Sequence, residues 1–152
     1  MYLAHYLGLL RRSEEELARA FRDVGRDHAA EPDVFHVSER LAGQCEEHAR
    51  RLEPFVGRYA EEGPKEPERL AATLFQGSRT GGLGLLRDLH DLYLMASGCD
   101  IAWTVVAQAA RGLRDTELLS VVRSCERETR AQLLWLTTRM KQAAPQALIV
   151  AA

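Results

Sequence analysis

The sequence lacks the features of a disulfide-rich or a membrane-spanning chain. It has only three cysteines in 152 residues, Cys45, Cys99 and Cys125, which are odd in number and widely spaced. This usage argues against a disulfide framework and favours a reducing, cytoplasmic location. No apolar run approaches the roughly 20 residues that a membrane-spanning helix needs. We therefore expect no membrane span.

The chain also lacks an excess of charge of one sign. It carries 20 basic and 22 acidic residues, a formal net charge of -2, and the two signs are interspersed. A strongly basic surface for nucleic acid or for an anionic membrane is therefore not expected. The apolar N-terminal stretch "MYLAHYLGLL" precedes its positive charges, the opposite order to a signal peptide, and predicts the start of a helix.

Alternation of apolar and polar residues is almost absent, and helical periodicity takes its place. Apolar residues recur at 3-4 spacing along four segments, which predict helices over about 2–29, 33–62, 82–111 and 116–143. The first two inward rows are Leu3, Leu7, Leu10, Glu14, Leu17, Phe21, Val24 and His28, then Val34, Ser38, Leu41, Cys45, His48, Leu52, Phe55 and Tyr59. The other two rows are Leu85, Leu89, Leu92, Ala96, Trp103, Ala107 and Ala110, then Leu118, Val122, Cys125, Thr129, Gln132, Leu136 and Met140.

The connections between these helices predict how the helices are arranged. Short turns join the first two and the last two helices, so each of these pairs should be antiparallel. A long crossover over 63–81, with a short helix in "PERLAATLF", lets the second and third helices run parallel. Gly112 should end the third helix, and Pro145 begins an apolar tail over 145–152. The sequence predicts one all-α domain over 1–152, an up-down four-helix bundle.

Polar residues on the inward rows are candidates for chemistry, because a buried polar group is costly unless it is paired. Glu14 lies on the first row, and Cys45 and His48 lie on the second. The turn between these helices is centred near residue 31, so antiparallel packing should place Glu14 level with His48 and one turn from Cys45. We expect the three side chains to cluster halfway along the bundle.

These residues resemble a pattern of the ferritin-like superfamily, over about residues 2–143. Its di-iron members bind metal through an inward glutamate on helices one and three and Glu-x-x-His on helices two and four. Glu14 matches the first glutamate. On the second helix the motif falls on Cys45 and His48, so the histidine matches and a cysteine replaces the glutamate.

The other half of the family pattern is missing. Ala96 stands at the best position for the third-helix glutamate, with Asp100 one turn further along. On the fourth helix "ETRAQLLWL" fits the family register, but Thr129 and Gln132 occupy the ligand positions. The resemblance implies a ferritin-like bundle that has lost a complete di-iron site.

Three functional hypotheses follow. The first is a non-catalytic structural or partner-binding module without a cofactor, paired with a second copy or another protein through the apolar tail. The second is a metalloprotein with one zinc or iron ion held by Glu14, Cys45 and His48, because thiolate and imidazole suit zinc. The third is a small-molecule pocket between the helices, beside Ala96. Its candidate lining residues are Ala96, Asp100, Thr129, Gln132 and Trp135.

The remaining charged residues are expected to serve the surface. Glu46 and Glu47 should point outward and pair with Arg50 and Arg51, four residues later. Asp88 and Asp91 are expected on the outer face of the third helix. The stretch "GSRTGGLG" lacks the features of a P-loop, although Arg79 and its backbone N–H groups suit an anion at a helix start.

Overall fold

The computed structural model describes residues 1–60 and 75–150 and contains no strand within them. Its elements are α1 (Leu3–Asp27), α2 (Pro32–Arg58), α3 (Gly81–Leu113), α4 (Thr116–Pro145) and the π-helical turn η1 (Gln146–Val150). The prediction of an all-helical chain with four long helices is confirmed. Most of the expected crossover, including nearly all of its predicted short helix, lies at 61–74, outside the described residues.

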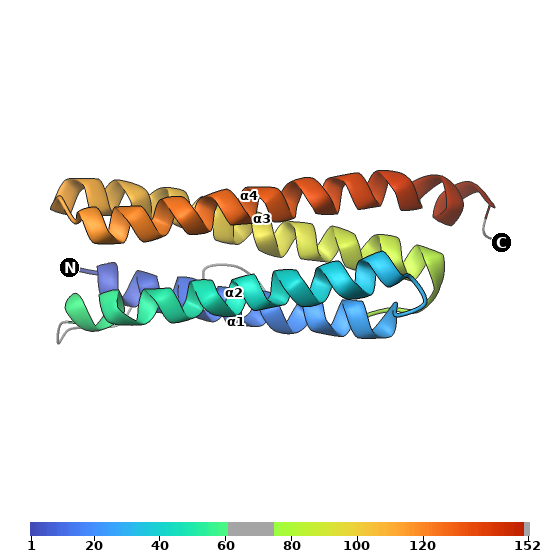
Figure 1. The fold of residues 1–152 in the computed structure, drawn as a ribbon, viewed down its shortest axis with the longest axis horizontal. Coiled ribbons are helices and arrows are strands. Elements are labelled where there is room, and N and C mark those ends of the chain that lie inside the picture. Colours follow the sequence, from blue (N-terminus) through green and yellow to red (C-terminus); the bar gives the residue numbers. More distant parts are fainter. Residues whose placement is uncertain (61–74, 151–152) are drawn as a thin grey trace.

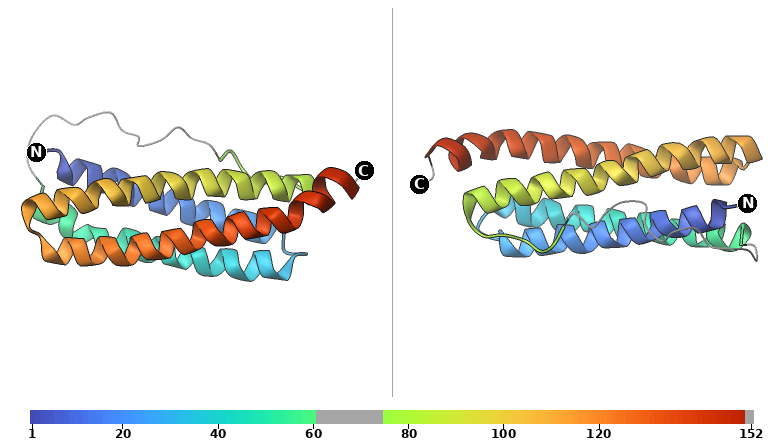
Figure 2. Two further views of the ribbon diagram at one scale, coloured as in Figure 1. Left: turned by 90° about the horizontal axis from the view of Figure 1, so that it is seen from above. Right: turned by 180° about the vertical axis from the view of Figure 1, so that it is seen from behind.

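The four long helices lie in two layers along one axis (Figure 1). One layer contains α1 and α2, the other α3 and α4, and the two helices within each layer run in opposite directions (Figures 1 and 2). Packing is most extensive within the layers, less so between α1 and α3, and least between α2 and α4. The edge between α2 and α4 is therefore the loosest side of the structure.

The four predicted inward rows form the core. Every residue of the first and third rows is buried, and only Tyr59 and Met140 in the other two rows are partly buried. Trp103 and Phe21 are the largest side chains that are fully buried. Each large apolar side chain buried in this way stabilises the fold by roughly 1.5–3 kcal/mol relative to an exposed one.

Two helix boundaries follow the sequence signals, and a third does not. Pro32 occupies the first turn of α2, and the Asp115 side chain caps α4 by accepting a 3.0 Å hydrogen bond from the Leu118 N–H. The expectation that Gly112 ends the third helix is wrong. Gly112 lies within α3, and Arg114 takes the left-handed conformation at the C-cap, with φ 55°.

The C-terminal segment continues past Pro145 in helical form. Pro145 is the last residue of α4, and the chain then forms the turn η1. Ala147 is buried, whereas the side chains of Leu148, Ile149 and Val150 are exposed to solvent. The predicted apolar tail is thus partly docked, and its outer side is apolar.

Within residues 1–60 and 75–150, no helix combines the length and the apolar character needed to cross a bilayer.

Arg114→Gly should stabilise the protein, because a left-handed backbone costs about 1 kcal/mol in a residue that has a Cβ. We expect the free energy of unfolding, measured with chemical denaturant, to rise by about 0.5–1 kcal/mol. Arg111→Gly, three residues earlier inside the helix, is the matched control and should lower the free energy of unfolding by about 1 kcal/mol. A loss of stability in both variants would contradict the assignment of the cap.

A buried carboxylate–histidine cluster as candidate site

A buried ion pair lies at the centre of the core. Glu14 falls on the inward row of α1, and His48 on the inward row of α2, and both side chains are fully buried. His48 Nδ1 lies 3.3 Å from Glu14 Oε1. The antiparallel register of the first two helices predicted this proximity, and the structure brings the two side chains together.

Trp103 of α3 supplies the second contact to Glu14. Its indole Nε1–H donates a 2.9 Å hydrogen bond to Glu14 Oε1, and its ring meets the His48 ring edge-on, with centroids 5.8 Å apart. The other carboxylate oxygen, Oε2, is buried and has no hydrogen-bond partner. The apolar row predicted Trp103 only as a core residue, so its role as a donor was missed.

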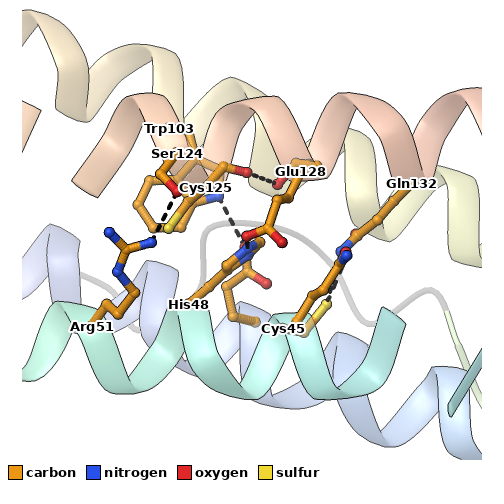
Figure 3. A network of polar contacts seen from close by, with 11 residues as sticks. Cys45, His48, Arg51, Trp103, Ser124, Cys125, Glu128 and Gln132 are labelled. Carbon is orange, nitrogen blue, oxygen red and sulfur yellow. Dashed lines mark hydrogen bonds and ion pairs between the residues drawn. The ribbon is translucent and has the colours of Figure 1, made fainter. Parts of the chain in front are cut away.

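Glu128 of α4 connects the cluster to solvent. Its Oε1 lies 3.1 Å from His48 Nε2, and its side chain is 38% exposed (Figure 3). The helical pattern placed Glu128 beside the inward row, but its long side chain reaches the imidazole across the loose edge between α2 and α4. A continuous polar chain therefore runs from Glu128 through His48 to Glu14 and Trp103.

This arrangement favours the charged form of His48. Burial lowers the pKa of the imidazole, but the hydrogen bonds and charges of Glu14 and Glu128 outweigh burial and raise the pKa above its ordinary value. An imidazolium can donate from both nitrogens, one to each carboxylate. Its stabilising contribution is complete below the ordinary histidine pKa of about 6.5 and is lost as pH rises through the raised pKa.

Cys45 and the α4 residues at the ligand positions make other contacts. The Cys45 thiol lies 3.9 Å from Gln132 Oε1, and the Gln132 amide donates to Gln44 Oε1 at 3.1 Å. The Thr129 hydroxyl donates to the Cys125 carbonyl within α4, at 2.8 Å. Thr129 and Gln132 are therefore both occupied by hydrogen bonds within the protein, and Figure 3 shows Gln132 reaching toward Cys45.

The three cysteines are buried, unpaired thiols. Burial, and next the charge of Glu14, raise the pKa of Cys45 and of Cys99 well above the usual range. Burial raises the pKa of Cys125 to about 12. The thiols are consequently protonated at neutral pH, and the protonated form is the less reactive one.

The two α3 candidates occupy different surroundings. Ala96 is fully buried in the core. Asp100 lies toward α4, where its Oδ1 is 3.7 Å from Arg130 Nε, and its side chain is 26% exposed. Burial raises the pKa of Asp100, and Glu126 adds to this, while Arg130 opposes it. Asp100 therefore pairs at the edge of α4, apart from the Glu14–His48 pair.

The described ranges contain no group of three or more His, Cys, Asp and Glu side chains that could hold a metal ion. Glu14 and Glu128 contact opposite nitrogens of one imidazole. The metal hypothesis for Glu14, Cys45 and His48 stays a prediction, to be tested by measurement.

A second buried cluster, near one end of the bundle, was not predicted. The expectation that Asp88 lies on the outer face is wrong, since its side chain is fully buried. Its Oδ2 lies 2.8 Å from Nε2 of His28, the C-cap residue of α1, and accepts the Arg79 N–H at 2.8 Å. The Arg79 guanidinium binds Asp88 and Asp91, at 2.9 Å each. Arg79 is thus engaged by carboxylates, which weakens the suggestion of an anion site there.

Glu46 and Glu47 point away from the core as expected, but their partners are not the ones predicted for both. Glu47 pairs with Arg50, three residues later, and Glu46 pairs with Arg22 of α1. Arg51 instead donates a 3.0 Å hydrogen bond to the Ser124 hydroxyl of α4 (Figure 3).

Comparisons with protein-family models, with curated proteins and with solved structures found no match to this chain.

Glu128→Gln should lower the pKa of His48, because it removes one of the two charges that favour the imidazolium. The measurement is an NMR titration of the His48 ring nitrogens. We expect a pKa above 6.5 in the parent protein and a downward shift of several tenths to one unit in the variant. Glu126→Gln, two residues away on α4, is the control and should leave the titration unchanged. An identical His48 titration in the parent and in Glu128→Gln would refute the contact.

Proposed function

We propose that the protein is a ferritin-like up-down four-helix bundle without a complete di-iron site, acting as a non-catalytic structural or partner-binding module in the cytoplasm. The all-helical fold and the parallel course of α2 and α3 support this assignment (Figure 1). The three free, buried thiols are consistent with a reducing compartment.

One observation carries the non-catalytic part of the proposal. The two side chains that match ferritin-type ligands are engaged within the protein: His48 contacts a carboxylate at each ring nitrogen, and Glu14 Oε1 also accepts from Trp103. A buried polar network of this kind favours one register of the helices over others, which is a structural role.

The partner-binding part of the proposal has a different support. The end of the described chain presents Leu148, Ile149 and Val150 to solvent on one short helical turn, although Ala147 docks on the bundle. A cluster of exposed apolar side chains is typical of an interaction site. The proposed partner is a second copy of this chain or another protein.

A metal-binding function is the second candidate, and one observation favours it. Glu14 Oε2 is buried without a hydrogen-bond partner. A cation bound by Glu14, Cys45 and His48 would satisfy this oxygen and would stabilise a Cys45 thiolate. Zinc or iron are the ions that such a donor set fits.

Metal analysis of protein purified without chelator separates the two functions. The proposal predicts less than a tenth of an equivalent of zinc or iron per chain, and an unchanged value in His48→Ala. His36→Ala, an exposed histidine on the same helix, is the matched control. About one equivalent of metal that is lost in His48→Ala but kept in His36→Ala would overturn the proposal in favour of the metalloprotein.

A further inference from the structure

Helix α3 has a second apolar row on the face opposite the core. Leu94, Ile101 and Val105 are 39%, 65% and 47% exposed, and with Gly98 they follow a 4-3-4 spacing. This is the spacing of the inward rows, and such a row makes a continuous seam along a helix. We call these four residues the outer α3 row.

The outer α3 row is free of charge over its whole length. Between Asp91 and Arg111 the only charged side chain of α3 is Asp100, which lies toward Arg130 of α4. Helix α3 is therefore apolar nearly all round, as helices buried on every side are. Its inner face packs against α1 and α4, and among residues 1–60 and 75–150 no other long helix covers its outer face.

Gly98 adds an independent observation. A Cβ at this position would meet no atom of the described residues within 4 Å, so packing among them does not require a glycine. Glycine inside a helix is less stable than alanine, and no close packing within the described part of the chain compensates for it here. A missing side chain in the middle of an apolar row lets another helix approach closely.

We propose that the outer α3 row binds the outer α3 row of a second copy, in an antiparallel pair about a two-fold axis. The 4-3-4 spacing is symmetric about its midpoint, so a two-fold axis there places Gly98 opposite Ile101 and Leu94 opposite Val105. Ile101, the most exposed side chain of the row, then fills the space at Gly98 of the other copy. The row itself carries no charged side chain, so pairing the two rows brings no like charges together.

This inference rests on the proposed role as an interaction module and names the partner and the surface. The surface is distinct from the apolar turn η1. Failure of this inference can be distinguished from failure of the proposed function. The oligomeric state of the α3 variants tests the inference, whereas the metal content tests the proposed function.

Sedimentation velocity of the full chain over a range of concentrations is the test. The parent protein should dimerise, and Ile101→Glu should raise the dimer dissociation constant at least tenfold while leaving the helical circular dichroism unchanged. Gly98→Ala should also weaken the dimer, although it should raise the melting temperature of the dilute monomer by improving the helix. A weaker dimer together with a more stable monomer distinguishes helix docking at Gly98 from a simple effect on helix propensity.

Two controls separate this surface from other apolar surfaces. Leu134→Glu changes an exposed apolar residue of α4, and a chain truncated after Pro145 lacks η1; both should keep the dimer. A monomeric parent protein, a dimer indifferent to Ile101→Glu, or a dimer lost only on truncation would each overturn the inference. Binding of the monomer to phosphatidylcholine vesicles that Ile101→Glu abolishes would likewise overturn it, in favour of a lipid surface.

Discussion

The structure depends on one buried carboxylate. Glu14 lies in the middle of the bundle, where an isolated charge would be strongly destabilising. Its partners come from the other helices: His48 from α2 and Trp103 from α3, with Glu128 of α4 on the far side of the imidazole. Each of the four helices thus supplies one residue to the same hydrogen-bonded chain, which ties their rotations and axial positions together.

The position of this hydrogen-bonded chain of side chains explains why α2 packs more loosely against α4 than α1 does against α3. The α2–α4 edge carries polar cross-links at intervals, such as the 2.7 Å bond from Arg139 to Asp33 and the Gln132–Gln44 bond. Glu128 enters through this edge and keeps partial contact with water. Proton exchange between His48 and solvent therefore has a route through the edge where packing is loosest.

The sequence predicted the core well, and it predicted the site only in part. Nearly every residue of the four 3-4 rows is buried, because burial along a helix follows its period, and the short first turn placed Glu14 beside His48. Glu128 and Asp88 were missed because their partners lie on helices whose relative register no short turn determines. His28, polar and last on its inward row, was the available signal that a carboxylate should lie opposite.

The most direct test of the central claim is a double-mutant cycle between Glu14 and His48, read as the free energy of unfolding in buffer with chelator. Glu14→Leu and His48→Leu should each cost about 3 kcal/mol, because each leaves a buried polar partner behind. The double variant should cost at least about 1 kcal/mol less than the sum, since neither Glu14 nor His48 is then left buried without the other. Additive costs would contradict the account, because the two side chains would then contribute to stability independently.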